Sequence, residues 1–368
     1  MGVNPESKKS KKVGSGRRAT LKEVAAEVGV SVATVSNAYN RPDQLSEELR
    51  IRIFEAAKRL GYSGPDPLGR SLRKRRAGAI GVLYADRLSY AFTDPAAVMF
   101  LEGVSFAAEE AGLGLFLVPG GSGTSGVGEG VLSASVDGFV VYCVSAADPL
   151  IGAVIERRLP VVLVDDPSRE SVTSIGIDDE GGASAAAEHL AGLGHRSFAV
   201  VSFKLTLEPD RGLADHARQE SANNEDTRSR LRGYKTAIEA AGTSWEDVPV
   251  YECPENTPEE GKAAAEVLLG REPRPTAILT LSDQLAFGVM EAARGLGLSI
   301  PGDLSIVGFD DVSEAARTTP PLTTVYQPHV EKGLKAGRKL IAQLEGEDPG
   351  EPELLPTRLV VRGSTASP

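Results

Sequence analysis

Apolar residues recur every three or four positions in three short segments between residues 20 and 60, which predicts three amphipathic helices. Thr20, Ser31 and Ser46 precede the segments, at positions where a helix N-cap accepts a backbone hydrogen bond. Gly29 and Gly61 follow the first and third segments and can supply the left-handed residue that ends a helix. The apolar positions are Leu21, Val24, Ala25 and Val28, then Val32, Val35 and Ala38, then Leu49, Ile53, Ala57 and Leu60.

A tight turn at Gly29 joins the first two predicted helices, which is typical of a helix-turn-helix. In that motif the second helix lies in the major groove of DNA with its N-terminal residues at the base edges. The polar face of this helix has no charge and offers hydroxyl and amide groups, which can read base edges. A three-helix module that binds proteins is the alternative interpretation. The polar positions are Ser31, Thr34, Ser36, Asn37 and Asn40.

From residue 79 onward, short continuous apolar runs alternate with helical stretches. Strands that are apolar throughout are buried on both faces, so this rhythm predicts parallel sheets covered by helices. The length suits two doubly wound lobes, in which ligands bind at the carboxyl ends of the strands. The runs include AIGVLY, GFVVY, PVVLV, FAVVS, AILTL and LSIVGF, and helices are expected at 95–112, 148–158, 182–193, 230–241, 258–269 and 283–296.

Between the two patterned regions lies a linker, residues 63–78, with the sequence SGPDPLGRSLRKRRAG. Asp66 and Pro67 suit the N-cap and first position of one short helix, which would contain Arg70 and Leu72. A helix this short is unstable alone in water, so we expect it to form when docked. Leu72 would then be an apolar wedge able to part base steps in the minor groove. A flexible basic tether is the alternative.

Charge divides the chain in the same place. Residues 1–78 carry 17 Lys and Arg against 8 Asp and Glu, a balance of +9, and the remainder carries 23 against 43, a balance of −20. A basic head on an acidic body indicates that the head meets a polyanion, although a solvated tail without a partner has the same composition.

Several classes of protein are excluded or disfavoured. No run approaches the ~20 apolar residues that a membrane span needs, and the basic N-terminus lacks the apolar core of a secretory signal. Cys143 and Cys253 are the only cysteines, so we expect a cytoplasmic protein without a disulfide framework or a metal. The Gly-rich segment 120–130 lacks the GK[ST] of a phosphate loop, and no G-x-S-x-G, HExxH or CxxC occurs. We therefore expect no enzymatic activity and no cofactor, with a solute-binding protein or an enzyme of unrecognised type as alternatives.

Residues 19–62 resemble the DNA-binding head of the lac-repressor (LacI/GalR) family of bacterial transcription regulators, in the sequence ATLKEVAAEVGVSVATVSNAYNRPDQLSEELRIRIFEAAKRLGY. The resemblance continues in order through LRGYKTAIEAAG, AILTLSDQLAFGVMEAARGLGLSIPGDLSIVGFDDV and LPTRLVVRGST. It implies a homodimer that binds a pseudo-palindromic operator in double-stranded DNA, with repression as the expected mode. A small effector, a sugar or similar polar metabolite, would control it. No C-terminal heptad repeat is present, which favours a dimer over a tetramer.

The resemblance also implies the fold and its boundaries. The fold is an all-α helix-turn-helix headpiece followed by an α/β core like that of type I periplasmic binding proteins, with two doubly wound parallel-sheet lobes. We expect a flexible basic tail at 1–18, the headpiece at 19–63, the hinge at 64–78, and the effector-binding and dimerisation core at 79–368. Within the core, the N-lobe would comprise 79–177 and 327–350, and the C-lobe 178–326 and 351–366.

The resemblance assigns residues to two sites. Arg230 and Asp310 match the family's effector-binding arginine and aspartate, whose paired donors and acceptors suit vicinal hydroxyl groups. An aspartate at a strand end can instead simply cap the following helix. The polar segment 204–227 is either a lid over the effector site or a plain surface loop. Further effector candidates are Asp165, Asp178, Asn256, Ser282, Asp283, Tyr90 and Phe92. The expected DNA contacts are Thr20, Ser31, Val32, Ala33, Thr34, Ser36, Asn37, Asn40, Arg70 and Leu72.

Overall fold

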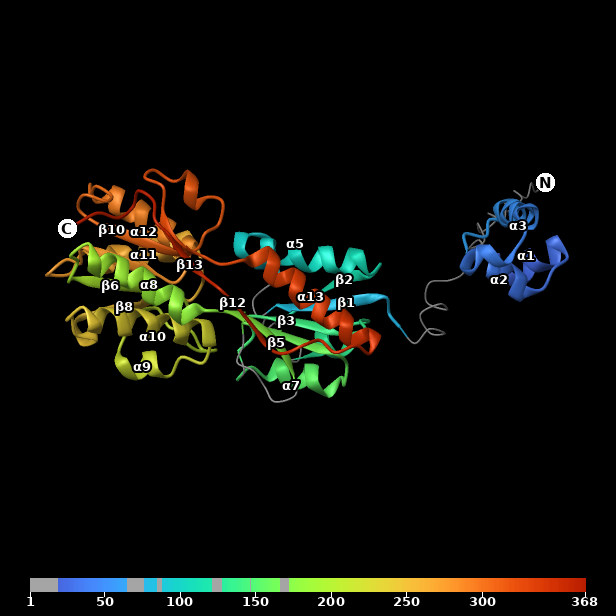
Figure 1. Cartoon of the computed structure of the whole chain (residues 1–368), viewed down its shortest axis with the longest axis horizontal. Helices are drawn as coiled ribbons and strands as arrows, with labels where there is room; N and C mark the ends of the chain where they lie inside the picture. The colour runs from blue at the N-terminus through green and yellow to red at the C-terminus, as the bar shows by residue number, and fades with distance from the viewer. Residues whose placement is uncertain (1–18, 65–75, 85–87, 121–127, 146, 166–171) are drawn as a thin grey trace, which may run out of the picture. The chain divides into compact units, whose positions relative to one another are not determined.

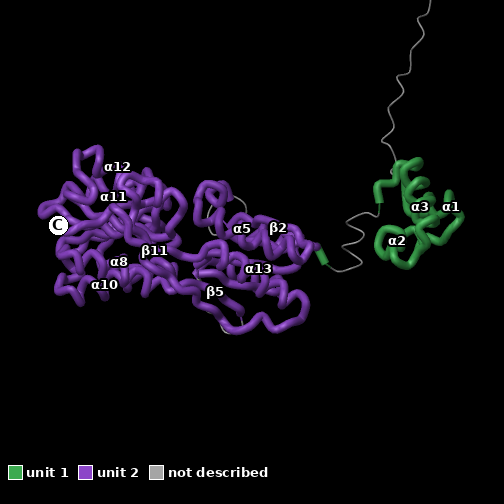
Figure 2. Tube along the Cα trace, turned by 45° about the horizontal axis from the view of Figure 1, so that its top comes forward, with its two compact units in different colours: residues 1–77 green, residues 78–368 purple. Residues whose placement is uncertain are grey.

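The computed structural model describes residues 19–64, 76–84, 88–120, 128–145, 147–165 and 172–368. The chain divides into two compact units, residues 1–77 and 78–368, which are coloured separately in Figure 2. The predicted basic tail and most of the predicted hinge, including Arg70 and Leu72, lie outside the described residues.

Unit 1 is a three-helix bundle whose helices begin and end where the local signals place them. Thr20 forms a capping box with Glu23, and Ser31 and Ser46 accept backbone hydrogen bonds from the first turns of the following helices. Gly29 ends the first helix with a φ of 76°, in the left-handed region that favours glycine. The helices are α1 (Leu21–Val28), α2 (Val32–Asn40) and α3 (Glu47–Leu60), with a 3-10 turn η1 (Pro42–Gln44).

The core of unit 1 is small and fully apolar. Val24, Val35 and Ile53 contribute one residue from each helix and have no exposed surface. Tyr39 closes one end with edge-to-face contacts to Phe54 and Tyr62, at ring-centroid distances of 5.0 and 5.9 Å. Because these contacts use the apolar face of α2, the opposite face of that helix remains outside the core.

Unit 2 contains two sheets, each covered by helices on both faces (Figure 1). The N-lobe sheet is parallel throughout, in the order β12-β5-β4-β3-β1-β2. The C-lobe sheet has the order β13-β11-β10-β9-β6-β8-β7, with antiparallel pairing only at its two edge strands. The N-lobe strands are β1 (Ala79–Tyr84), β2 (Gly114–Pro119), β3 (Phe139–Tyr142), β4 (Val161–Val164), β5 (Thr173–Ile177) and β12 (Glu353–Leu355). The C-lobe strands are β6 (Phe198–Ser202), β7 (Gly212–Ala214), β8 (Val250–Glu252), β9 (Ala277–Thr280), β10 (Ser305–Asp310), β11 (Thr323–Tyr326) and β13 (Arg358–Val360).

The helices pack in pairs against these sheets. In the N-lobe they are α5 (Pro95–Glu110), α6 (Glu129–Ser133), α7 (Pro149–Glu156) and α13 (His329–Glu345), with the turn η2 (Tyr90–Phe92). In the C-lobe they are α8 (Asp179–Gly192), α9 (His216–Glu220), α10 (Glu225–Ala240), α11 (Pro258–Leu269) and α12 (Asp283–Gly295), with the turns η3 (Trp245–Asp247) and η4 (Ala315–Arg317). The six helices predicted in this unit match α5, α7, α8, α10, α11 and α12 to within a few residues, with the largest differences at the starts of α8 and α10, whereas α13 was not predicted.

Helices α5 and α13 lie side by side across the N-lobe and approach so closely that only glycine fits at the crossing (Figure 1). A Cβ atom added at Gly103 would lie 2.0 Å from the carbonyl oxygen of Val330, and one added at Gly333 would lie 2.1 Å from that of Phe100. Both neighbours are backbone atoms, so they cannot move aside without moving a helix.

The chain passes between the lobes three times, after β5, after β11 and after β12. The last crossing corrects the expected boundary at residue 350. Strand β12 pairs with β5 in the N-lobe sheet, with Glu353 opposite Ile175, so residues 353–355 belong to the N-lobe and only β13 joins the C-lobe. The segment 204–227, expected as an irregular loop, contains strand β7 and helix α9.

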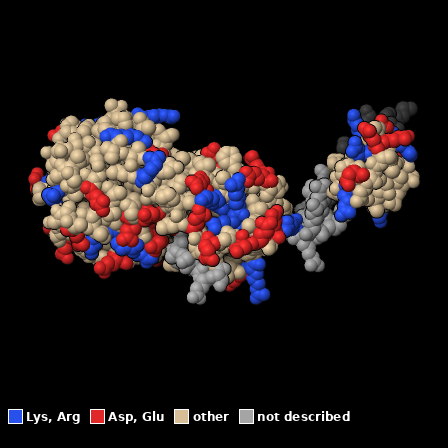
Figure 3. Space-filling view, in the orientation of Figure 1, with Lys and Arg blue, Asp and Glu red and all other residues tan. Residues whose placement is uncertain are grey.

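Acidic and basic side chains are interspersed over the visible face of unit 2 (Figure 3). Within the described residues, no helix combines the length and apolar character needed to cross a bilayer. The described residues also bring together no group of three His, Cys, Asp or Glu side chains that could hold a metal ion.

Candidate functional site

The first candidate site is the exposed face of α2. Val35 and Ala38 fix the helix in the core, while Val32 is 41 % exposed on the other side beside the exposed Ala33. The Ser31 side chain accepts a hydrogen bond from the Thr34 amide at 3.0 Å and so orders the first turn. The result is a rigid, uncharged surface of small apolar and hydrogen-bonding groups.

The remaining predicted DNA-contact residues of unit 1 are placed near the helix ends or along α2. The Thr20 hydroxyl belongs to the capping box and is exposed. The Asn40 side-chain amide donates to the Ser36 carbonyl oxygen at 2.9 Å, which stabilises the last turn of α2. Ser36 and Asn37 are partly exposed on the same helix. All eight predicted positions within the described part of unit 1 are therefore exposed or partly exposed.

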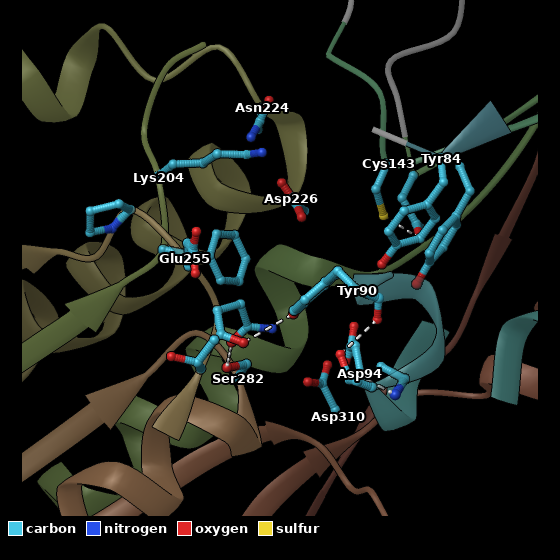
Figure 4. A pocket seen from close by; sticks show the side chains of 18 of the residues that line it. Tyr84, Tyr90, Asp94, Cys143, Lys204, Asn224, Asp226, Glu255, Ser282 and Asp310 are labelled. Atoms are coloured by element: carbon cyan, nitrogen blue, oxygen red, sulfur yellow. Dashed lines mark hydrogen bonds between the residues drawn. The ribbon is translucent and has the colours of Figure 1, made fainter. Parts of the chain in front are cut away.

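The second candidate site is a pocket of about 410 Å³ between the lobes of unit 2, at the carboxyl ends of strands from both sheets (Figure 4). A cavity of this size fits a small molecule. Its wall comprises Tyr84, Ser89, Tyr90, Thr93, Asp94, Ala96, Tyr142, Cys143, Asp165, Phe203, Lys204, Asn224, Asp226, Arg230, Pro254, Glu255, Asn256, Thr257, Ser282, Asp310 and Gln327.

Arg230 extends from α10 into the floor of this pocket and is held rigidly. Its Nε donates to Asp179 Oδ1 at 2.7 Å, its Nη1 donates to the Leu281 carbonyl oxygen at 2.6 Å, and the guanidinium lies 3.8 Å from the centre of the Phe309 ring. Burial by itself would lower the pKa of Arg230, but the nearby carboxylates of Asp179 and Asp310 raise it. The arginine is thus a fixed, permanently charged donor.

Asp310 ends β10 beside Arg230, with a positive φ of 123°. Its Oδ1 accepts a hydrogen bond of 2.6 Å from Gln327 Nε2. Burial raises the pKa of Asp310 to about 7, against the opposing effect of the Arg230 charge. Near neutral pH this carboxyl group therefore carries only part of its charge.

A buried polar chain links Asp310 to the N-lobe. Gln327 Oε1 accepts a hydrogen bond of 3.0 Å from Lys332 Nζ, which also forms an ion pair with Asp165 Oδ2. The side chains of Lys332 and Asp165 are 1 % and 6 % exposed. Because Gln327 lies in the segment that crosses between the lobes, this chain connects the pocket floor with both lobes.

Two further hydrogen bonds cross the cleft directly. The Tyr90 hydroxyl donates to the Asn256 carbonyl oxygen at 3.0 Å, and the Ser145 hydroxyl donates to the Asn223 carbonyl oxygen at 2.8 Å. Asn256 also accepts a hydrogen bond from the Ser282 hydroxyl through its side chain. These contacts hold the lobes together on both sides of the pocket.

The segment 204–227 forms one wall of the pocket. Glu252 is buried and anchors it, accepting hydrogen bonds from the Leu205 and Asp210 amides at 3.0 and 3.1 Å and from Arg218 Nε at 2.8 Å. The anchored segment supplies Lys204, Asn224 and Asp226 to the pocket wall. This segment is therefore an ordered part of the pocket wall rather than a plain surface loop.

Six of the nine effector candidates lie on the pocket wall, namely Arg230, Asp310, Asp165, Asn256, Ser282 and Tyr90. The other three do not. Asp178 is exposed and caps α8, accepting from the Gly181 amide at 2.9 Å, so its neighbour Asp179 is the partner of Arg230. Asp283 is completely buried and accepts hydrogen bonds from the Val312 amide and the Thr324 hydroxyl, and Phe92 is 63 % exposed.

Sequence reasoning missed several residues of the wall. Tyr84 and Tyr142 are the last residues of β1 and β3, and Phe203 directly follows β6, so a rule that strand ends meet the ligand could have found them. Lys332, which lies behind the wall, gave no such signal because the same amphipathic helix contains two other lysines and an arginine.

Two protein-family models match the chain. The model of the lacI family of bacterial regulatory proteins matches residues 20–64, and the model of the periplasmic binding protein-like domain matches residues 187–365. The first covers the three-helix bundle and the second covers most of the C-lobe with the returning segments. Both agree with the fold class expected from the sequence.

Whole-length relatives agree with these models. The HTH-type transcriptional regulator Rv3575c of Mycobacterium tuberculosis is 46 % identical over 358 residues, which cover 96 % of this chain and 98 % of that protein. A solved LacI-family transcriptional regulator from Corynebacterium glutamicum is 38 % identical with a TM-score of 0.72, covering 96 % of this chain and 99 % of its own. The solved complex of the transcriptional regulator CelR with cellobiose is 29 % identical with a TM-score of 0.68, covering 94 % and 100 %.

Proposed function

The chain belongs to the LacI family of bacterial transcription regulators, and from this premise we propose that it is a repressor that binds a pseudo-palindromic operator as a homodimer. In this proposal the ligand in the interlobe pocket controls the affinity for the operator. The family consists of DNA-binding regulators rather than enzymes, and the relatives carry that name.

The observation that carries the proposal is the uncharged outer face of α2 in a basic head. Val32, Ala33 and Asn37 would contact base edges in the major groove, where methyl and amide groups discriminate between base pairs. Thr20, Ser31, Thr34, Ser36 and Asn40 would support these contacts or bind phosphates. Arg70 and Leu72, outside the described residues, are proposed to reach the minor groove.

A sugar or a similar polar metabolite suits the pocket. Arg230 offers fixed donors, Asp310 offers acceptors beside it, and Phe203 and Tyr84 provide aromatic surface. Vicinal hydroxyl groups need paired donors and acceptors of this kind. The similarity to a regulator solved with cellobiose supports the same class of ligand.

Apolar side chains exposed on the N-lobe support a homodimer. Val98 and Phe106 on α5 and Phe116 on the edge strand β2 are each 44 % exposed. Helix α5 packs against β2, so these exposed apolar side chains belong to adjoining elements, as in surfaces that another protein covers. A two-fold dimer formed through such a surface would match a pseudo-palindromic operator, because each head reads one half-site.

Control by the ligand would act through the relative angle of the lobes. The polar chain from Asp310 to Lys332 and the Tyr90–Asn256 hydrogen bond both connect the two lobes. A ligand bound at Asp310 would contact this chain and so favour one angle between the lobes. Coupling of about 1–3 kcal/mol between ligand and operator is normal for such linkage.

Gel-shift selection on genomic fragments, followed by anisotropy titration of the selected operator, tests the proposal. Asn37→Ala should weaken operator binding roughly tenfold or more, with little change on random duplex, because a lost base contact costs about 1–3 kcal/mol. Arg230→Ala should keep operator affinity and lose the response to any ligand found in a thermal-shift screen. A chain that prefers no fragment over random competitor, with or without metabolites, would contradict the proposal.

A further inference from the structure

The balance of charge on the pocket wall is unusual for a site that would hold an anion. Among the described residues that line the cavity, five have a carboxyl side chain and two have a basic one. All five come from segments that lie far apart in the sequence, so the fold rather than one acidic segment brings them together. The acidic residues are Asp94, Asp165, Asp226, Glu255 and Asp310, and the basic ones are Lys204 and Arg230.

The strongest cation is already neutralised inside the protein. Arg230 forms an ion pair with Asp179 at 2.7 Å, and the two side chains are only 6 % and 10 % exposed. The buried Lys332 behind the wall is likewise paired with Asp165. In Figure 4 the Lys204 side chain extends toward Asn224 and Asp226. Acidic side chains therefore outnumber basic ones among the described residues of the wall, and its arginine is engaged with Asp179.

Two of the carboxyl groups on the wall are harder to ionise than in water because they are buried. Burial raises the pKa of Asp226 and raises that of Asp310 to about 7, even though Arg230 acts in the opposite direction on both. Groups that already resist ionisation in this cavity would oppose another negative charge more strongly. They would accept hydrogen bonds from hydroxyl groups without such a penalty.

We propose that the pocket selects an uncharged, multiply hydroxylated ligand and rejects the phosphorylated or carboxylated form of the same molecule. This inference rests on the proposed function, because it specifies the ligand of the same pocket. The neutral hydroxyl groups would donate to Asp310 and Asp226 and accept from Arg230. Among the described residues of the wall, a phosphate group would meet several carboxyl groups and no arginine except Arg230, which is paired with Asp179.

Alkylation of Cys143 tests the charge selection without knowledge of the ligand. This thiol lines the pocket, whereas the other cysteine, Cys253, is fully buried outside it. Iodoacetamide and iodoacetate differ mainly in charge and attack the same thiolate, so the ratio of their rates does not depend on the thiol pKa. One carboxylate about 8 Å away slows the anion roughly fivefold at an effective dielectric constant of about 40.

We expect the ratio of the neutral to the anionic rate to exceed that of 2-mercaptoethanol at least about fivefold in the full chain. Asp226→Asn should lower the ratio, while Glu239→Gln, on the exposed side of the same helix, should leave it unchanged. If Cys143 reacts too slowly, Thr93→Cys in a Cys143→Ala background places an exposed thiol on the pocket wall. A ratio equal to that of 2-mercaptoethanol at either position would overturn the inference.

Matched ligand pairs give a second measurement by calorimetry on the full chain. Ribose with ribose 5-phosphate, and glucose with glucuronate, differ in one anionic group. Any pair that binds should favour the neutral member at least tenfold, and tighter binding of the anionic member would overturn the inference. Operator binding is measured separately, so a chain that prefers no DNA would refute the proposed function while leaving the charge selection standing.

Discussion

Replacement of Lys332 by methionine removes the positive end of a buried ion pair that links the two lobes. The ammonium group contacts Asp165 Oδ2, Gln327 Oε1 at 3.0 Å and the Tyr142 ring at 5.6 Å, and the side chain is 1 % exposed. Methionine has a similar volume but cannot donate a hydrogen bond. Asp165 Oδ1 has no hydrogen-bond partner among the described residues, so the variant leaves this carboxylate with the Cys143 thiol at 3.6 Å.

Leaving one charge of a buried pair uncompensated costs about 3–5 kcal/mol. We therefore expect Lys332→Met to lose this much of the free energy of unfolding of unit 2, equivalent to roughly 10 °C in Tm for a unit of this size. The double variant Lys332→Met with Asp165→Asn should recover most of the loss, because no buried charge then lacks a partner. Lys335→Met removes a half-exposed lysine from the same helix and should cost less than about 1 kcal/mol.

Urea unfolding followed by two signals measures the effect. Far-ultraviolet circular dichroism reports on the whole chain, and fluorescence of Trp245, the single tryptophan, reports on the C-lobe. If the polar chain joins the lobes, both signals should shift together in Lys332→Met. A loss similar to that of Lys335→Met, or a double variant no more stable than the single one, would refute the reasoning.

Two further predictions concern packing and pH. Gly333→Ala should destabilise unit 2 by several kcal/mol in thermal unfolding, since its Cβ would lie 2.1 Å from the Phe100 carbonyl oxygen. The control Gly152→Ala on α7, with no atom within 4 Å, should be neutral or stabilising by up to about 1 kcal/mol. Equal effects of the two substitutions would count against the close approach of α5 and α13. Asp310 has a pKa raised to about 7, so the folded state binds more protons than the unfolded state between about pH 4 and 7, and the free energy of unfolding should fall across that range by up to ~1.4 kcal/mol per pH unit. Asp310→Asn should reduce this slope, although Asp179, whose pKa is also raised to about 7, preserves part of it. An unchanged slope in chemical unfolding at several pH values would contradict the raised pKa of Asp310.

Local patterns in the sequence were enough to predict most elements and two of the site's features. The N-caps Ser31, Ser46 and Ser282 act within three residues of their partners, so no distant contact is needed to infer them. The same holds for the uncharged face of α2, which follows from helical spacing alone. The doubly wound lobes follow from the alternation of apolar strands and helices.

The tertiary structure decided which neighbouring groups meet. Asp178 and Asp179 are chemically identical neighbours with different partners. Asp178 caps α8, whereas Asp179, the first residue of that helix, reaches Arg230 on α10. Strand β12 has only three residues and no pattern of its own, so its pairing with β5 rather than with the C-lobe depends on where the chain crosses.

Lys332 shows the same limit most clearly. By sequence it is one of several basic residues in an amphipathic helix. Its ion-pair partner Asp165, directly after β4, lies 167 residues away along the chain. The sequence by itself determined the local elements, the basic head and the kind of protein, because these depend on residues close together in the chain. The ion pairs and the charge of the pocket depend on side chains from five or more separate elements, so only the folded arrangement could define them.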